Sequence, residues 1–227
     1  LILVDPYTDR IEQYREHVTI INKSLSEISD WQEALQGVFC VIHLAAAVHW
    51  LPKTVEEEKI FIRVNAEETK DLYNACKKHD VERFLFFSTN DVYEASDRMI
   101  TEETPIDGQG IYGKSKLLAE QLLFKESETD KTSICIFRPA SIYGENDKGS
   151  MKSLIAFCRK GIVPMIGKGE NKKALLYLKD AVQAVKRYIE GDKSFNGEFF
   201  NISSGNFAYK EIIDTICKCY GYKPIRL

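Results

Sequence analysis

Tyr112 and Lys116 are the residues of this sequence whose types and spacing point most directly to chemistry. Residues four apart on a helix share a face, so the lysine ammonium would lie beside the phenol ring. A nearby cation stabilises the phenolate and lowers the pKa of a tyrosine from about 10 towards neutrality. A phenol tuned in this way can exchange a proton with a substrate hydroxyl while hydride moves to or from a nicotinamide. The pair therefore indicates general acid–base catalysis of a redox step.

A second pair with the same spacing, Tyr73 and Lys77, shows that spacing alone does not identify a site. Tyr73 lies in the middle of a helical pattern, on a face expected to pack, and we interpret this pair as structural. Tyr112 instead begins a helix directly after the loop 105–110, which is rich in glycine, proline and aspartate. The context therefore favours Tyr112 and Lys116 as the reacting pair.

The elements that must position this pair alternate between short apolar segments and longer helical patterns. The predicted strands are Leu1–Val4, Val18–Ile21, Val38–Leu44, Arg83–Ser88, Ser133–Arg138 and Glu198–Ile202, and the predicted helices are Ile28–Leu35, Ile62–Lys78, Tyr112–Glu128, Met151–Arg159, Leu178–Glu190 and Tyr209–Tyr220. Several strands are apolar on both faces, which is typical of a parallel sheet covered by helices. The order predicts an α/β fold with a Rossmann-like, doubly wound parallel sheet. Asp30 and Glu33 have the spacing of a capping box for the first helix.

The alternation loosens after Gly144, which suggests two parts. We expect residues 1–144 to form a dinucleotide-binding domain. Residues 145–227 are expected to contribute both to the sheet and to a small C-terminal substrate lobe. The sequence opens within an apolar run at Leu1, so we expect a glycine-rich phosphate loop to precede it and further substrate-binding sequence to follow Leu227.

Residues at the carboxyl ends of the strands are candidates for ligand binding, because ligands of doubly wound sheets bind there. Asp5 follows the first strand, where an acidic residue binds ribose hydroxyls, although it also suits a turn before Pro6. The small residues 45–47 follow the third strand, and either close ligand approach or helix packing explains them. Ser88 and Thr89 end the fourth strand. His43 lies inside its strand and is expected to be a hydrogen-bonded core residue.

The composition is that of an ordinary globular enzyme, with 44% hydrophobic and 29% charged residues. A formal charge of -3 gives no electrostatic reason to expect nucleic acid or an anionic membrane as partner, and no apolar run is long enough to span a bilayer. The six cysteines include one close pair, Cys217 and Cys219, without the second pair that a zinc site requires. We expect free thiols, a cytoplasmic location and no metal site.

Taken together, several segments resemble the extended short-chain dehydrogenase/reductase family, in particular its NAD-dependent epimerase/dehydratase branch. They follow the family's order and spacing from Leu1 to about Gly205. The matching segments are Val41–Ala46, Val64-Asn65, Ser88–Tyr93, Tyr112–Lys116 with Ala119-Glu120, and Arg138-Pro139 with Tyr143-Gly144.

The resemblance implies a role for each matching residue. Tyr112 would be the general acid and base, Lys116 would modulate its pKa and hold the nicotinamide ribose, and Thr89 would bind the reacting sugar oxygen. The implied sites are catalytic (Thr89, Tyr112, Lys116), NAD-binding (Asp5, Leu44, Ala45, Ala46, Asn65, Tyr112, Lys116, Pro139) and substrate-binding (Thr89, Asn90, Ser141, Lys173). Relatives commonly dimerise through the helix that carries the Tyr-Lys pair and the helix before it, so a homodimer is expected.

Departures from the family pattern separate the possible reactions. Dehydratases of the branch resemble Thr-Asp-Glu after the fourth strand, whereas this sequence has Thr89-Asn90-Asp91, and Asn90 cannot act as an acid. Ser24 and Glu68 replace an aspartate and a glycine usual in relatives. We therefore expect NAD-dependent epimerisation of a nucleotide sugar, similar to that of UDP-glucose 4-epimerase. The alternatives are an NAD(P)-dependent reductase or dehydrogenase of a sugar nucleotide or small carbonyl compound, and a non-catalytic dinucleotide sensor.

Overall fold

The computed structural model describes residues 1–48, 50–94, 96, 98–127, 131–147, 149–160, 162–163, 167–191, 195–221 and 225–226. The chain divides into two compact units, of which the first contains Leu1–Arg138 and Asp192–Phe200 and the second contains Pro139–Gly191 and Asn201–Leu227. This division falls after Arg138, a few residues before the boundary at Gly144 that the sequence pattern suggested. The reason is that residues 141–143 form a strand in the sheet of the second unit.

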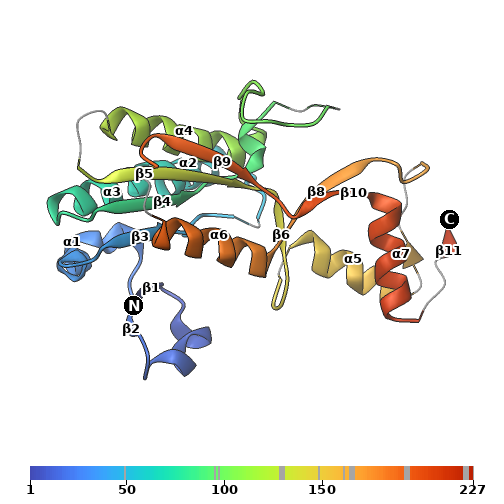
Figure 1. The fold of residues 1–227 in the computed structure, drawn as a ribbon, viewed down its shortest axis with the longest axis horizontal. Coiled ribbons are helices and arrows are strands. Elements are labelled where there is room, and N and C mark those ends of the chain that lie inside the picture. Colours follow the sequence, from blue (N-terminus) through green and yellow to red (C-terminus); the bar gives the residue numbers. More distant parts are fainter. Residues whose placement is uncertain are drawn as a thin grey trace. The chain divides into compact units, whose positions relative to one another are not determined.

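A four-stranded sheet with the order β3-β4-β5-β9 organises the first unit (Figure 1). Its strands are β3 (Cys40–His43), β4 (Arg83–Phe87), β5 (Ser133–Pro139) and β9 (Glu198–Ile202). The first three strands are parallel. In their register Cys40 pairs with Arg83, and Arg83 pairs with Ser133. Parallel neighbours need crossover connections, and helices supply them here. The predicted α/β architecture is thus confirmed.

Two helical segments cross over between these strands. The first joins β3 to β4 and consists of α2 (Val55–Ile62), the π-helical turn η5 (Arg63–Glu67) and α3 (Glu68–Lys78). The second, α4 (Gly110–Ser127), joins β4 to β5. The predicted end of this second helix, Glu128, lies outside the described residues. In Figure 1, α2, α3 and α4 lie together along one face of the sheet.

The core of the first unit lies between the sheet and these helices. Its buried residues are Phe84, Phe86, Ile134 and Ile136 from the strands, Leu72, Tyr73, Ala75 and Cys76 from α3, Ala119 and Leu123 from α4, and Trp31, Leu35, Ala66 and Val81. Tyr73 is fully buried and donates a hydrogen bond to the carbonyl of Thr132 at 3.0 Å. This packing supports the interpretation of Tyr73 and Lys77 as a structural pair.

The N-terminal strands β1 (Ile2–Val4) and β2 (Thr19–Ile21) form a separate parallel pair, connected by the turns η1 (Thr8–Arg10) and η2 (Glu12–Tyr14). A helical segment follows as η3 (Leu25–Glu27), α1 (Ile28–Trp31) and η4 (Gln32–Leu35).

The predicted capping box of Asp30 and Glu33 is wrong, because the helical segment begins earlier. Its cap is Ser24, whose backbone N–H donates to the Glu27 carboxylate at 2.9 Å, and Asp30 instead pairs with Lys23 at 3.1 Å. Ser24 and Glu27 have the same spacing as Asp30 and Glu33, so the pattern was right and its position was not.

The second unit is built on a three-stranded sheet with the order β10-β8-β6. Its strands are β6 (Ser141–Tyr143), β8 (Lys172–Tyr177) and β10 (Gly205–Ala208), and β7 (Ile162–Val163) pairs separately with β11 (Ile225–Arg226). Helices α5 (Ser150–Arg159) and α7 (Tyr209–Cys219) share a core of buried apolar residues, and α6 (Leu178–Glu190) follows β8. The predicted helices of this region are confirmed, but the sheet was not foreseen.

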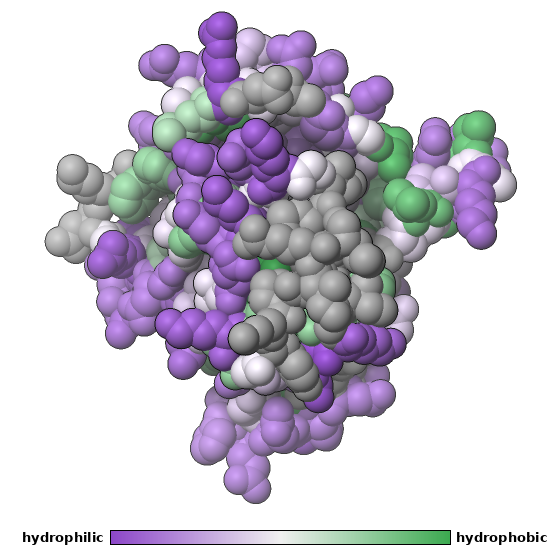
Figure 2. Space-filling model, turned by 90° about the vertical axis from the view of Figure 1, so that its right-hand side faces the viewer, coloured by the Kyte–Doolittle hydropathy of each residue, from purple (hydrophilic) through white to green (hydrophobic). Residues whose placement is uncertain are grey.

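The surface and the cysteines agree with an ordinary globular protein. The coloured residues on the face in Figure 2 are mainly hydrophilic, with hydrophobic residues in small areas. Within the described part of the chain, no helix has the length and apolar character needed to cross a bilayer. All six cysteines are free thiols, and Cys76, Cys135, Cys158 and Cys217 are buried, as expected.

Candidate active site

The carboxyl end of β4 places two buried hydroxyl groups next to each other. Thr89 is 6% exposed, and its Oγ1 accepts a hydrogen bond from the Asp91 N–H at 3.2 Å, which caps the turn η6 (Asn90–Val92). The Ser88 N–H donates to the Phe137 carbonyl at 2.8 Å, but the buried Ser88 hydroxyl has no hydrogen-bond partner among the described residues. A buried hydroxyl without a partner is a group that a ligand can satisfy.

The first turn of α4 packs directly on η6, because the helix has a glycine at the contact. A Cβ atom on Gly113 would lie 2.3 Å from the Asp91 carbonyl oxygen, a backbone atom that cannot move aside. The backbone N–H of Gln109 donates to the same oxygen at 2.5 Å. The Gly113 of the sequence motif thus brings the neighbouring Tyr112 up to the segment that follows Thr89.

Tyr112 does not have the lowered pKa that the sequence suggested. Burial of the phenol, with a smaller contribution from the negative charge of Asp91, raises the pKa of Tyr112 to about 12. Asp91 keeps an exposed surface, yet partial desolvation raises the pKa of its carboxyl group, against the opposing effect of a hydrogen bond from Thr89. In the ligand-free protein Tyr112 is therefore a neutral proton donor at physiological pH.

The burial of Lys116 explains why its ammonium does not lower the pKa of Tyr112 as expected. Its side chain is 1% exposed, and Nζ lies 4.2 Å from the centroid of the Phe86 ring. Burial lowers the pKa of Lys116 to about 7, although the charge of Glu120 acts in the opposite direction. The ammonium is therefore only partly populated at neutral pH.

This lowered pKa predicts how stability depends on pH. Between about pH 7 and pH 10 the unfolded chain binds a proton on Lys116 that the folded chain has released, so the free energy of unfolding rises with pH. The slope from this one group approaches about 1.4 kcal/mol per pH unit. Urea unfolding at pH 7, 8 and 9 should show the rise in the cofactor-free protein and not in Lys116→Met. Parallel curves for the two proteins would mean that Lys116 stays charged when folded.

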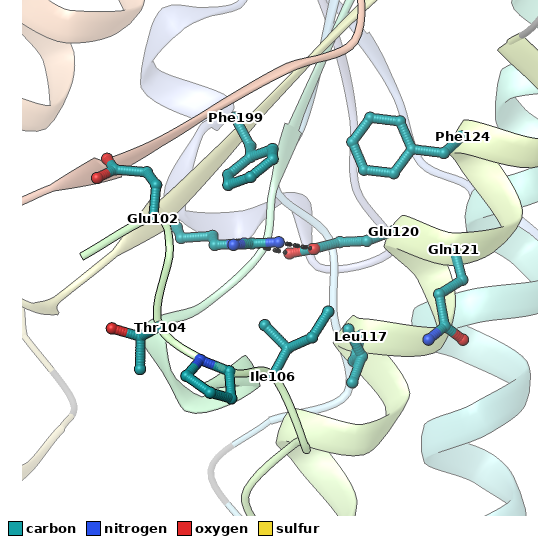
Figure 3. A pocket seen from close by; sticks show the side chains of 10 residues that line it. Glu102, Thr104, Ile106, Leu117, Glu120, Gln121, Phe124 and Phe199 are labelled. Carbon is teal, nitrogen blue, oxygen red and sulfur yellow. Dashed lines mark hydrogen bonds and ion pairs between the residues drawn. The ribbon is translucent and has the colours of Figure 1, made fainter. Parts of the chain in front are cut away.

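Glu120, four residues after Lys116, forms a buried ion pair with Arg138 from β5. Arg138 donates from Nε and Nη2 to the two carboxylate oxygens, at 3.1 and 2.5 Å, and from Nη1 to the Tyr93 hydroxyl at 2.8 Å. The guanidinium lies 4.1 Å from the Phe199 ring centroid. Figure 3 shows this pair facing a pocket of about 340 Å³ between α4 and the loop that contains Ile106. Glu120 therefore connects β5 to the helix that carries Tyr112 and Lys116.

Asn65 is buried behind the loop that follows β3 and bonds to the backbone of that loop. Its side chain is fully buried, with Oδ1 accepting from the Ala47 N–H at 2.7 Å and Nδ2 donating to the Ala47 carbonyl at 3.1 Å and to Ser115 Oγ at 2.9 Å. Asn65 is part of the π-helical turn η5, and such turns are frequent at functional sites. In this structure Asn65 holds the loop against α4, which makes it a positioning residue.

His43 is a core residue, as predicted. It is 3% exposed and its Nε2 lies 2.8 Å from Thr69 Oγ1, which itself donates to the Asn65 carbonyl at 2.9 Å. Because the threonine proton is used in that bond, the histidine must donate from Nε2. Burial lowers the pKa of His43 to about 3, so the ring is neutral. Through Thr69 it is connected to the backbone carbonyl of Asn65.

The residues expected to bind NAD in the first unit fit a flat ligand. Leu44 is 63% exposed, Ala45 is exposed and Ala46 is half-buried, so the edge after β3 is open and has small side chains. Asp5 is exposed at the end of β1 and uses Oδ1 to accept from the Tyr7 N–H at 2.6 Å. Its second carboxylate oxygen is suited to ribose hydroxyls.

The remaining predicted residues lie elsewhere. Asn90 is half-buried in η6 of the first unit. Pro139, Ser141 and Lys173 belong to the second unit. Ser141 is exposed on β6, and Lys173 on β8 donates from Nζ to Ser150 Oγ at 2.9 Å, next to the first turn of α5. Among the described residues no group of three histidine, cysteine or acidic side chains is arranged to hold a metal ion.

Two contributors were not identified as such from the sequence. The role of Glu120 depends on its contact with Arg138, although its position four residues after Lys116 was a usable signal. A second pocket, of about 260 Å³, is lined by Tyr112 together with Val48, Trp50, Leu51 and Phe61. The large side chains of Trp50 and Leu51 soon after the alanines were a usable signal, but only the fold brings them next to Tyr112.

A Rossmann-like sheet with Thr89 at the end of a strand, followed by a helix that carries Tyr112 and Lys116, is the arrangement expected of the family that the sequence resembles. The model of the NAD dependent epimerase/dehydratase family matches residues 1–203 of the chain. The chain belongs to this family, and the predicted resemblance is confirmed.

Known relatives place the chain within that family. The chain is 30% identical over 168 residues to an Escherichia coli N-acetyl-alpha-D-glucosaminyl-diphospho-ditrans,octacis-undecaprenol 4-epimerase, covering 71% of the chain and 50% of that protein. It is 29% identical over 196 residues to a Dictyostelium discoideum sterol-4-alpha-carboxylate 3-dehydrogenase, decarboxylating, covering 82% and 58%. The chain thus spans between half and three fifths of these relatives.

A solved structure has the same fold. The UDP-glucuronic acid 4-epimerase of Bacillus cereus superposes with a TM-score of 0.88 at 21% identity, covering 100% of this chain and 76% of the other. This similarity extends over both units of the present chain.

Proposed function

We propose that the protein epimerises a nucleotide sugar by transient hydride transfer with NAD, in the manner of a UDP-glucose 4-epimerase. The observation that carries the proposal is the packing of the Tyr112 turn on the segment after Thr89, with Lys116 buried one helical turn further on. Relatives named as 4-epimerases of N-acetylglucosaminyl and UDP-sugar substrates support it.

The residues of the site divide the chemical work. Tyr112 moves a proton at its phenolic oxygen, to and from the sugar hydroxyl. Thr89, or the unpartnered hydroxyl of Ser88, binds the reacting oxygen. Lys116, buried one helical turn further on, would hold the nicotinamide ribose. NAD, when bound, supplies a reversible hydride acceptor and would be held by Asp5 and the small residues after β3. Inversion at the reacting carbon requires that the keto-sugar present its other face before the hydride would return to carbon and the proton to oxygen.

Asn90 supports epimerisation over dehydration. Elimination of water needs an acid and a base beside the hydride-transfer site. Asn90 has no proton to donate at neutral pH, and Asp91 instead acts on the pKa of Tyr112. The chain therefore has one of the two groups that dehydration requires.

A proton NMR time course of the full-length protein with UDP-glucose and UDP-N-acetylglucosamine tests the proposal. We expect the 4-epimer of at least one sugar to form with no net change in absorbance at 340 nm, because the hydride is returned in each cycle. Net formation of NADH would contradict epimerisation and indicate a dehydrogenase. Formation of a 4-keto-6-deoxy sugar, with a new C6 methyl signal, would indicate a dehydratase.

Assembly and location are also part of the proposal. We infer a homodimer formed through α3 and α4, as is common in the family, and light scattering of the full-length protein distinguishes it from a monomer. The six free thiols support a reducing compartment such as the cytoplasm.

A further inference from the structure

Tyr112 lines a pocket whose other described residues are all apolar. This apolar subsite consists of Val48, Trp50, Leu51, Phe61 and Tyr112, and its volume is about 260 Å³. Pockets that enclose a whole small-molecule ligand usually exceed about 300 Å³. The apolar subsite therefore has room for one portion of a nucleotide sugar and not for all of it.

The walls of the apolar subsite are built into the fold. The rings of Trp50 and Phe61 lie with centroids 4.7 Å apart, and Phe61 is 1% exposed in the last turn of α2. The loop is fixed one residue before Val48, where both backbone groups of Ala47 bond to the buried Asn65 side chain. These contacts fix the loop and the last turn of α2, from which the walls of the pocket come.

Two of these side chains are exposed to an unusual degree for their type. Leu51 is 86% exposed and Trp50 is 39% exposed, while Tyr112 beside them is partly buried. Exposed large apolar side chains that gather at a concave site mark a place where an apolar group binds. Because Tyr112 exchanges its proton with the reacting hydroxyl, the group in the pocket is attached next to the carbon that bears that hydroxyl.

We propose that the apolar subsite binds the substituent adjacent to the reacting carbon, and that this substituent is an alkyl group. For reaction at C4 of a hexose the substituents on the two neighbouring carbons are the C3 hydroxyl and C6, and of these only C6 can be an alkyl group, so the preferred substrate is a nucleotide 6-deoxyhexose. This inference rests on the proposed function and specifies its substrate.

Desolvation determines the order in which substrates are preferred. A methyl group at C6 loses no hydrogen bonds on entering the apolar subsite. The hydrogen-bonding groups on the described lining side chains are the Trp50 indole N–H and the Tyr112 hydroxyl, and the latter is used on the reacting oxygen. A hydroxymethyl group therefore exchanges its hydrogen bonds to water for at most one to the indole, and hydrophobic pockets reject an added hydroxyl by up to about 100-fold. A carboxylate at C6 is rejected more strongly, because its charge would be buried without a cation.

Three sugars with one nucleotide test this order in the full-length protein. We expect kcat/KM for UDP-6-deoxyglucose to exceed that for UDP-glucose by about 10- to 100-fold, with UDP-glucuronic acid lowest, as measured by NMR of the 4-epimers. Equal values for UDP-6-deoxyglucose and UDP-glucose would overturn the inference and leave the epimerase proposal standing. Turnover of none of the three would overturn both.

A substitution at Leu51 tests the location of the subsite. Leu51→Arg places a cation at a position that is 86% exposed, so folding should be unaffected and the preference should shift from the 6-deoxy sugar towards UDP-glucuronic acid by at least about 10-fold. Val182→Ala, at an apolar residue that is 56% exposed on α6, should leave the order unchanged. If Leu51→Arg instead weakens NAD binding in calorimetry and preserves the sugar order, the pocket belongs to the cofactor and the inference is wrong.

Discussion

Replacing Tyr112 by phenylalanine is expected to lower kcat by about 100- to 10,000-fold, the range in which a positioned general acid–base group contributes. Phenylalanine keeps the ring that lines the apolar subsite and removes only the oxygen that moves the proton. The affinity for NAD, measured by calorimetry, and the KM for the sugar should therefore change little. The rate is measured by NMR with the best substrate of the wild-type protein.

Tyr73→Phe is a matched control for this experiment, because Tyr73 has a lysine at the same spacing. Its hydroxyl bonds to the Thr132 carbonyl in the core, so its removal should cost about 1 kcal/mol of stability and leave kcat unchanged. A Tyr112→Phe enzyme that retains wild-type kcat, or a Tyr73→Phe enzyme that loses it, would contradict the assignment of Tyr112 as the proton-transfer group.

Removal of the Glu120 carboxylate is expected to destabilise the fold by about 3–5 kcal/mol, as for other buried ion pairs that lose one partner. Glu120 and Arg138 are 2% and 3% exposed, so the remaining guanidinium would be left buried with an uncompensated charge. Its contacts with the Tyr93 hydroxyl and the Phe199 ring do not neutralise it. The cost is measured as the change in the free energy of urea unfolding of Glu120→Ala.

Glu126 on the same helix provides the comparison. Its carboxylate pairs with Lys77 at 3.3 Å, and both side chains retain solvent exposure, so Glu126→Ala should cost at most about 1 kcal/mol. The double variant Glu120→Met with Arg138→Met should recover much of the lost stability, because no charge is then left buried. If Glu120→Ala and Glu126→Ala have similar costs, the buried pair does not hold β5 to α4 as the structure indicates.

The fold of the first unit could be predicted because its strands are apolar on both faces and its helices are long. The boundaries of β4 and β5 were within one residue of those expected. The strands of the second unit were missed for a physical reason. β6 has only three residues, and the apolar run of β8, Ala174–Tyr177, continues directly into Leu178 of α6, so no local signal separates the strand from the helix. Their stability comes from pairing with each other, which is a long-range contact.

The sequence names the candidate residues, whose roles stay predictions, but it does not give their electrostatics. Sequence spacing identified Tyr112 and Lys116 and the neighbouring Thr89. It could not show that Lys116 is buried against Phe86, which lowers the lysine pKa instead of the tyrosine pKa. Asn65 was assigned to the cofactor, yet its contacts are with Ala47 and Ser115, which is 50 residues away in the sequence. Such contacts follow from packing and not from a local pattern.

The division of the chain into units limits how the protein can be recombined with its relatives. The chain leaves the first unit after Arg138, returns at Asp192 and leaves again after Phe200. The returning segment brings Phe199, which stacks on the Arg138 guanidinium. A chimera that exchanged everything after Arg138 as one cassette would thus replace part of the first unit as well. Transfer of the second unit from a relative requires two separate grafts, 139–191 and 201 onwards, with the host's own 192–200 left in place.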